Sequence, residues 1–377
     1  MNGKIKFYEL DAFRGLAAIG VMLFHYGAHY KAQPFASLLK PIYSPALYRT
    51  DLLFILSGFV LTHAYLRSFR RSNIGENILR RFARIYPLHI ITLLIVAIEQ
   101  TIIKNILNEP NFIYKYNDWF HFVLNMGLLN SLGIQKGFSF NGPCWAISTL
   151  FYVNLLFFFI ISLSKRPILT SSFLIFLSFL LLFSKNRQLV NDGNIFIFDA
   201  HLVRTILDFF TGVLTYNLYK YFENKAVKTS VIYDLIFILI CGIMLSNASG
   251  KLGDVRYLDF ITVLFFFPSL IIFAIKGKIV SSFLNNIVLR SLGKLSYSIY
   301  LTHFPVQLLF YIFVLAGFDS IEFEKPTVIL FYFLVTIVCS FLSYNFIEKP
   351  FQNYIIVLIE RKRANRSDFN KLYRQRF

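Results

Sequence analysis

Two ionisable side chains, Arg14 and His25, lie in the first apolar segment of the sequence. They are eleven residues apart, so a helix would bring them within roughly 20° of the same face, about 16 Å apart along its axis. Ionisable side chains inside a membrane-spanning helix are costly and usually face a protein interior or a wet cavity. The pair therefore predicts a polar stripe along one helix. An imidazole, which titrates near neutral pH, is suited to act there as a general base.

Asp11 lies three residues before Arg14, so the two side chains can meet on one helix face. The carboxylate would then orient the guanidinium, although a structural ion pair at the end of the helix is an alternative. His25 also allows a second interpretation, because a histidine inside a membrane can hydrogen-bond across a helix interface. His29 is expected near the outer interface with a structural role.

A second group of basic residues opens a later apolar segment. Arg81 and Arg84 share a helix face there. Paired guanidinium groups bind phosphate bidentately, so they indicate a site for a phosphorylated ligand. Basic residues at the cytoplasmic end of a span are also expected from the positive-inside rule, and the sequence leaves both interpretations open.

Polar residues also lie within two other apolar segments. Asp51 begins one of them and could face the same cavity as His25. Ser296, Tyr300 and His303 follow one another at four and three residues, which places them on one stripe of a helix. Pro305 would kink that helix and leave room for a cavity, although a purely structural polar interface between helices is the alternative.

The composition indicates which elements position these residues. The chain has 377 residues, of which 56% are hydrophobic and 15% charged, whereas a soluble domain carries about 25% charged residues. Its apolar runs predict an all-α polytopic membrane protein with about ten transmembrane helices. Residues 118–130 are too short to span and are predicted to lie at the interface or to re-enter. The predicted spans are residues 10–29, 51–66, 82–104, 146–163, 168–184, 202–219, 230–247, 258–276, 295–316 and 326–346.

The distribution of basic residues predicts the orientation. The loops on one side of the predicted membrane domain carry 25 Lys and Arg residues, and the loops on the other side carry 11. The side with more basic residues is cytoplasmic, which places both termini in the cytoplasm. The net charge of +18 is therefore a positive-inside signature, and no nucleic-acid partner is expected. We expect one integral-membrane domain over residues 1–350 and a basic cytoplasmic tail over 351–377. The three cysteines are scattered and predict neither a disulfide framework nor a metal site.

Six short motifs, in order along the chain, resemble the acyltransferase-3 family of integral membrane proteins. This family includes bacterial O-acetyltransferases that act on lipopolysaccharide O-antigen, exopolysaccharide and Nod factors. The resemblance extends from residue 10 to residue 350 and so covers nearly the whole chain. The motifs are LDAFRG at residues 10–15 followed by His25, DLLFILSGF at 51–59, RFARIYP at 81–87, NGPCW at 141–145, GKLSYSIYLTH at 293–303 and IEKP at 347–350.

The resemblance implies a multi-pass protein of the bacterial inner membrane that transfers an acyl group, most often acetyl. The donor would be cytoplasmic acyl-CoA, used as a substrate, with no tightly bound cofactor and no metal. The acceptor would be a hydroxyl of a surface or lipid-linked glycan, and membrane lipids would surround the chain. The Arg14–His25 separation is of the order that an extended pantetheine arm can bridge.

Site residues follow from the same resemblance together with the chemistry of the side chains. His25 is the expected general base, and a covalent acetyl-histidine is the less favoured variant. Arg14 and Asp11 are expected to belong to the catalytic group with His25. Arg14, oriented by Asp11, is also expected to join Arg81 and Arg84 in binding acyl-CoA. The expected acceptor cavity contains Asp51, Trp145, Ser148, Ser296, Tyr300 and His303.

One departure from the family pattern keeps other functions open. The family usually has W-S-(I/L)-x-x-E where this chain reads WAISTL over residues 145–150, so Leu150 replaces a carboxylate. An inactive member that binds acyl-CoA is therefore an alternative, as is a glycan polymerase or lipid-linked sugar transporter without an acyl donor. Some members end in a soluble esterase-like domain. The 31 residues after Phe346 are too few for one, so a stand-alone form is expected.

Overall fold

The computed structural model describes residues 6–45, 48–65, 74–186, 188–189, 193–225, 227–251, 257–318 and 321–376. These residues are almost entirely helical, with one antiparallel hairpin, so the prediction of an all-α polytopic membrane protein is confirmed. The elements are α1 (Tyr8–Tyr30), α2 (Ala36–Tyr43), α3 (Arg49–Tyr65), α4 (Ile74–Asn105), α5 (Trp119–Met126), the 3₁₀ turn η3 (Gly142–Cys144), α6 (Trp145–Leu163), α7 (Pro167–Asn186), β1 (Asn194–Ile195), β2 (Phe198–Asp199), α8 (Ala200–Asn224), α9 (Val231–Ala248), α10 (Leu258–Ile261), the π-helical turn η4 (Thr262–Phe266), α11 (Phe267–Lys276), α12 (Ile279–Leu284), α13 (Ile287–Leu315), α14 (Pro326–Ser343), the π-helical turn η5 (Tyr344–Glu348) and α15 (Lys349–Arg376).

Seven helical segments of the described residues are long and apolar enough to cross a membrane. Three further predicted spans coincide with α1, α3 and α8, except that residue 66 lies outside the described residues. The count of about ten spans and the cytoplasmic placement of the termini stay predictions. The seven segments are Ile74–Asn105, Gly142–Leu163, Pro167–Lys185, Val231–Ala248, Leu258–Lys276, Ile287–Leu315 and Pro326–Arg363.

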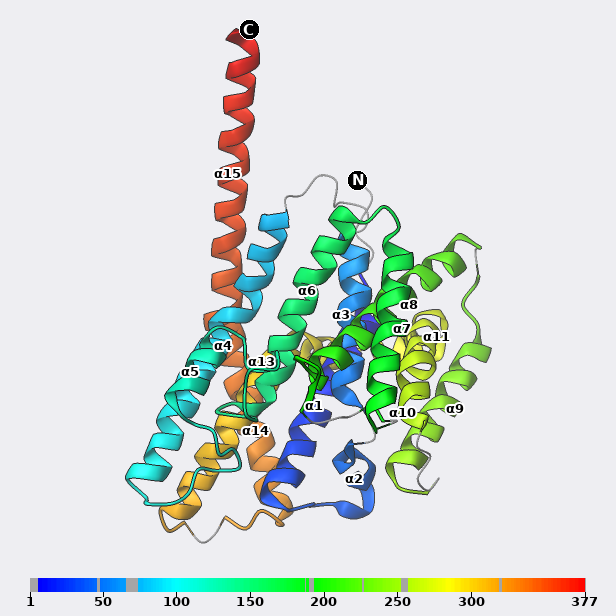
Figure 1. Cartoon of the computed structure of the whole chain (residues 1–377). Coiled ribbons are helices and arrows are strands. Elements are labelled where there is room, and N and C mark those ends of the chain that lie inside the picture. Colours follow the sequence, from blue (N-terminus) through cyan, green and yellow to red (C-terminus); the bar gives the residue numbers. More distant parts are fainter. Residues whose placement is uncertain are drawn as a thin grey trace.

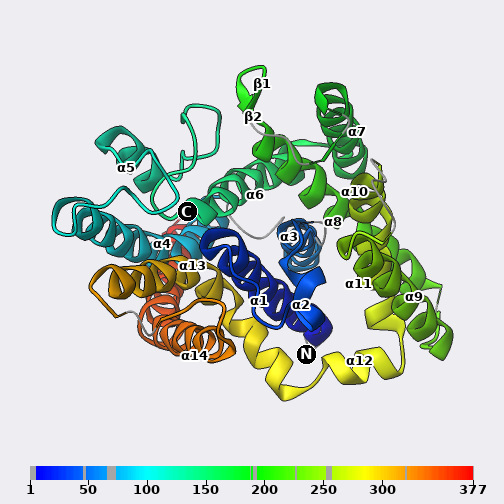
Figure 2. The ribbon, with the colours of Figure 1, turned by 90° about the horizontal axis from the view of Figure 1, so that it is seen from below.

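Helices α1 and α3 lie at the centre of the bundle, and the other long helices surround them (Figure 2). The main partner of α1 is α13, and the main partner of α3 is α8. α5 lies within the short segment predicted not to span and has only eight residues. Asp118 caps α5, because its carboxylate accepts a hydrogen bond from the His121 N–H at 2.9 Å.

Glycines set the distance between the helix backbones at the α1–α13 contact and at the α3–α8 contact. A Cβ atom on Gly293 of α13 would lie 2.1 Å from the Asp11 carbonyl oxygen of α1, and one on Gly15 would lie 2.8 Å from the Gly293 nitrogen. A Cβ atom on Gly58 or Gly212 would likewise lie 2.0 Å from a backbone oxygen across the α3–α8 contact. Small residues allow helix backbones in a membrane to approach this closely, and the close approach provides the van der Waals contact that holds them together.

Helix α13 continues through Pro305, where the sequence predicted a kink. A proline has no N–H, so it frees the carbonyl four residues earlier, at Leu301. The side-chain amide of Asn141 donates to that carbonyl oxygen at 3.0 Å. The Tyr300 hydroxyl donates in turn to the Pro143 carbonyl oxygen at 2.9 Å. The NGPCW motif thus compensates for the proline and fixes the start of α6 against α13.

The C-terminal helix packs beside the start of α4. Arg363 Nε donates to the Glu76 carboxylate at 2.8 Å, so these two segments lie at the same end of the bundle. Beyond this contact α15 extends away from the other helices (Figure 1). The helical backbone runs without interruption through residue 350, where the membrane domain is predicted to end.

The Gly293 contact predicts a specific effect on stability. Gly293→Ala should destabilise the detergent-solubilised protein by about 1–3 kcal/mol, because the added methyl group forces α1 away from α13. Thermal unfolding measures this change. Gly242→Ala on α9 is the matched control, since nothing lies within 4 Å of a Cβ atom there. Equal melting temperatures for the two variants would contradict the prediction.

Candidate active site

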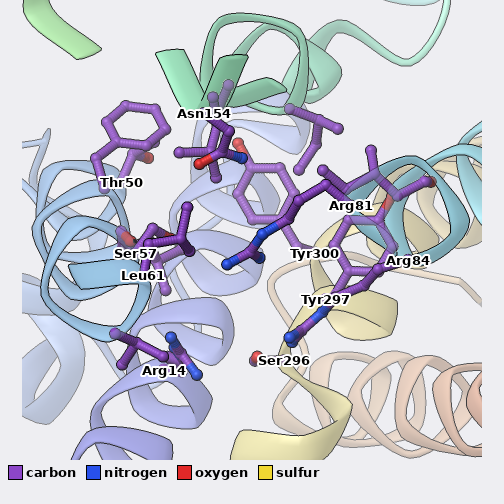
Figure 3. Close-up of a pocket in the computed structure, with 17 residues that line it drawn as sticks. Arg14, Thr50, Ser57, Leu61, Arg81, Arg84, Asn154, Ser296, Tyr297 and Tyr300 are labelled. Atoms are coloured by element: carbon purple, nitrogen blue, oxygen red, sulfur yellow. Dashed lines mark hydrogen bonds between the residues drawn. The ribbon is translucent and has the colours of Figure 1, made fainter. Parts of the chain in front are cut away.

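A cavity of about 110 Å³ opens between α1, α3, α4, α6 and α13 (Figure 3). The guanidinium groups of Arg14, Arg81 and Arg84 point into it from α1 and α4. Its polar lining is completed by Thr50, Ser57, Asn154, Ser296, Tyr297 and Tyr300, and its apolar lining includes Phe54 and Leu150. We call it the arginine cavity.

The arginine cavity is strongly cationic. None of its 17 lining residues is acidic. Arg14 lies 3.5 Å from an Asp11 carboxylate oxygen, as their spacing predicts. In the part of the chain that the structure describes, no carboxylate forms an ion pair with Arg81 or Arg84. Three guanidinium groups in a cavity without an acidic lining residue suit a multiply charged anion such as a phosphate ester.

A histidine cluster lies farther along α1. His25 Nδ1 is 3.2 Å from His29 Nε2, and His29 Nδ1 is 2.9 Å from the side-chain oxygen of Gln307 on α13. The His303 ring stacks on the His25 ring with 5.2 Å between centroids. Although three imidazoles meet here, no group of His, Cys, Asp or Glu among the described residues could hold a metal ion.

The contacts of this cluster are compatible with a tautomer in which His25 can accept a proton. An amide oxygen only accepts, so His29 Nδ1 donates to Gln307, and in the neutral ring His29 Nε2 is then the acceptor nitrogen. The Tyr114 hydroxyl lies 3.4 Å from the same His29 nitrogen. In the tautomer in which His25 Nδ1 donates to His29, the lone pair of His25 Nε2 is free. A neutral imidazole held in one tautomer by its neighbour is the arrangement of a general base.

The predicted acceptor residues lie in three different places. Ser296 and Tyr300 line the arginine cavity, and His303 contacts His25 instead. Asp51, Trp145 and Ser148 are absent from the cavity lining.

The three residues outside the cavity have partners of their own. Asp51 is buried and forms a bidentate ion pair with Arg204, both N–O distances being 2.5 Å. The Arg204 guanidinium lies over the Trp145 ring, which also packs against His201. Ser148 donates a hydrogen bond to the Leu128 carbonyl oxygen. The Asp51 carboxylate and the Ser148 hydroxyl are therefore satisfied within the protein.

Sequence reasoning missed two residues of the histidine cluster. His29 was expected near the outer interface with a structural role, and its contacts with both His25 and Gln307 were not foreseen. A signal was present, since His29 follows His25 by four residues and Gln307 follows His303 by four. Each pair therefore shares a helix face. Only the structure shows that the two faces meet.

Leu150, which stands where the family usually has glutamate, faces the arginines. It lines the arginine cavity together with Asn154, one turn further along α6. The Asn154 side-chain oxygen is buried without a hydrogen-bond partner among the described residues. The carboxylate that this chain lacks would therefore lie in the same cavity as the three guanidinium groups.

The fold and the two sites define a helical membrane protein with an anion-binding cavity and an imidazole cluster on one central helix. Residues 7–345 match the family described as "Acyltransferase domain", acyltransferase-3, so the chain belongs to this family. The chain is also similar to "Protein 2 in picA locus" of Rhizobium radiobacter, 36% identical over 94 residues. That match covers 24% of this chain and 44% of the relative, less than half its length. No solved structure matches the chain. The protein is thus a multi-pass membrane protein of the acyltransferase-3 family.

Proposed function

We propose that the protein transfers an acyl group, expected to be acetyl, from cytoplasmic acyl-CoA to a hydroxyl of a glycan. The observation that supports this most is the placement of two polar sites on α1, the arginine cavity at Arg14 and the histidine cluster at His25. They are separated by about 16 Å along the helix. One site suits the phosphates of the donor and the other suits deprotonation of the acceptor.

The donor end of the reaction is assigned to the arginine cavity. Arg81 and Arg84 carry no paired carboxylate among the described residues, so their charge is available to the phosphate groups of acyl-CoA. Arg14 adds a third guanidinium that Asp11 orients. The thioester then has to reach from this cavity along α1 toward His25.

The acceptor end is assigned to His25. His25 Nε2 takes the proton of the glycan hydroxyl while the hydroxyl oxygen attacks the thioester carbonyl carbon. The new C–O bond forms as the C–S bond breaks, and the CoA sulfur leaves as a thiolate that receives the proton from His25. Gln307 and His29 are positioning residues in this scheme, because they hold the His25 tautomer.

Replacing His25 tests the assignment of the base. His25→Ala should lower glycan acylation by about 10²-fold or more, because the attacking hydroxyl loses its proton acceptor. The measurement is the mass of surface glycan from cells that carry the wild-type or variant chain. His63→Ala is the control, since His63 contacts Tyr216 and is not part of the histidine cluster. Full acylation with His25→Ala would refute the assignment.

Replacing two arginines tests the donor site. Acetyl-CoA should raise the melting temperature of the purified wild-type protein, and Arg81→Gln/Arg84→Gln should abolish this increase. Arg80→Gln is the matched control, because Arg80 lies on the same turn but outside the cavity lining. Stabilisation that survives the double substitution would contradict the assignment. Stabilisation by acetyl-CoA without any acyl transfer would favour the alternative that Leu150 suggests, an inactive family member that binds acyl-CoA.

The hydrogen-bond chain predicts a separate role for Gln307. Gln307→Met should lower kcat about tenfold while leaving stabilisation by acetyl-CoA unchanged, because His29 loses the acceptor that fixes its tautomer. Gln307→Glu keeps an acceptor oxygen and should retain activity, but a carboxylate favours the imidazolium form. The rising limb of its kcat–pH profile should therefore move to higher pH. A wild-type kcat for Gln307→Met would contradict this role.

A further inference from the structure

A second cleft, of about 380 Å³, lies at the far end of α4 from the arginine cavity. It is formed by the last turns of α4, the first turns of α5, the preceding loop and Phe140. Twenty residues of α4 separate Arg84 from Lys104, which corresponds to about 30 Å along a helix. α5 lies beside the part of α4 that is remote from α15 (Figure 1). The function described above does not use this cleft.

The cleft combines a flat aromatic surface with polar side chains. The Trp119 side chain is 75% exposed, and its ring stacks on Phe122 with 5.4 Å between centroids. Lys104, Asn111 and Asp118 line the same concavity. The backbone N–H and the ring of His121 both bond the Asp118 carboxylate and lower its pKa, so it is ionised at neutral pH. Acceptors and donors therefore surround an exposed ring.

The cleft is connected to the histidine cluster by one short loop. The Asn117 side chain, at the edge of the cleft, donates to the Tyr114 carbonyl oxygen at 3.0 Å. The Tyr114 hydroxyl in turn lies 3.4 Å from His29 Nε2. A ligand in the cleft would therefore be held next to the loop that contacts His29, the neighbour of the proposed base.

We propose that this cleft binds the sugar units of the acceptor glycan, an inference that rests on the proposed transfer to a glycan. A pyranose ring has an apolar face of C–H groups and a rim of hydroxyl groups. The apolar face matches the Trp119 and Phe122 rings, and the hydroxyl rim matches the carboxylate, amide and ammonium groups. Trp119 is thus a binding residue for the acceptor, and the donor site is independent of it.

An exposed aromatic residue on a short helix can also serve simply to hold that helix at the membrane interface. α5 contains a residue that separates the two roles. Phe120 is 49% exposed and adjacent to Trp119, but it does not line the cleft. Interfacial anchoring would depend on both rings, whereas sugar binding depends on Trp119.

The experiment compares Trp119→Ala with Phe120→Ala in the full-length protein. The probe is a set of oligosaccharides prepared from de-acylated surface polysaccharide of the cells that carry the chain. Trp119→Ala should raise the KM for these oligosaccharides about tenfold, which equals about 1.4 kcal/mol. Its kcat and its stabilisation by acetyl-CoA should match the wild type. Lys104→Ala/Asn111→Ala should raise the same KM, and Phe120→Ala should leave it unchanged.

Failure of this inference can be told apart from failure of the proposed function. A wild-type KM in both cleft variants, or an equal increase for Trp119→Ala and Phe120→Ala, would overturn the sugar-binding role while the transfer reaction stands. If the wild-type protein transfers no acyl group, direct binding of the same oligosaccharides is measured by fluorescence titration in a Trp145→Phe background, where Trp119 is the sole tryptophan. Saturable binding there supports the cleft without the reaction, and no binding overturns both.

Discussion

The close approach of α1 to α13 is the contact on which the rest of the site depends. Gly15 and Gly293 let the two backbones touch, and polar groups of both proposed sites on α1 then have neighbours on α13. Near the start of α1, Arg14 shares a cavity with Ser296 and Tyr300. Further along, His25 and His29 meet His303 and Gln307. In lipid, the hydrophobic effect does not drive helices together. The close packing and the hydrogen bonds must therefore hold α1 and α13 in their relative position.

Buried polar groups impose a second requirement, because an unpaired group in hydrocarbon costs several kcal/mol. Many motif residues meet it by pairing with one another. Asn141 bonds the Leu301 carbonyl that Pro305 leaves free, and Ser298 bonds Glu348 of the IEKP motif. Pairing within the protein also explains why a motif residue need not face a substrate. Asp51 belongs to the second motif, yet both of its oxygens are bonded to Arg204.

The sequence predicts the helices well and their mutual orientation poorly. Length and hydropathy identify each apolar segment, and four-residue spacing identifies which residues share a face. Neither shows which faces meet. Asp51 and Arg204 are 153 residues apart, and their pairing depends on the rotation of α3 against α8. His29 and Gln307 were likewise missed because their contact arises only when α1 and α13 pack together.

The structure also bears on the carboxylate that this chain lacks. Leu150 faces the arginine cavity, so the main consequence of leucine in place of glutamate is a change in the net charge of this cavity. A glutamate there would neutralise part of the charge of Arg81 and Arg84, whereas leucine leaves both guanidinium groups to a bound anion. The hydrogen-bond chain from Gln307 through His29 to His25 contains no residue of α6. Replacing the carboxylate therefore changes the proposed donor site and leaves the proposed base intact, which favours an active transferase over an inactive ligand-binding protein.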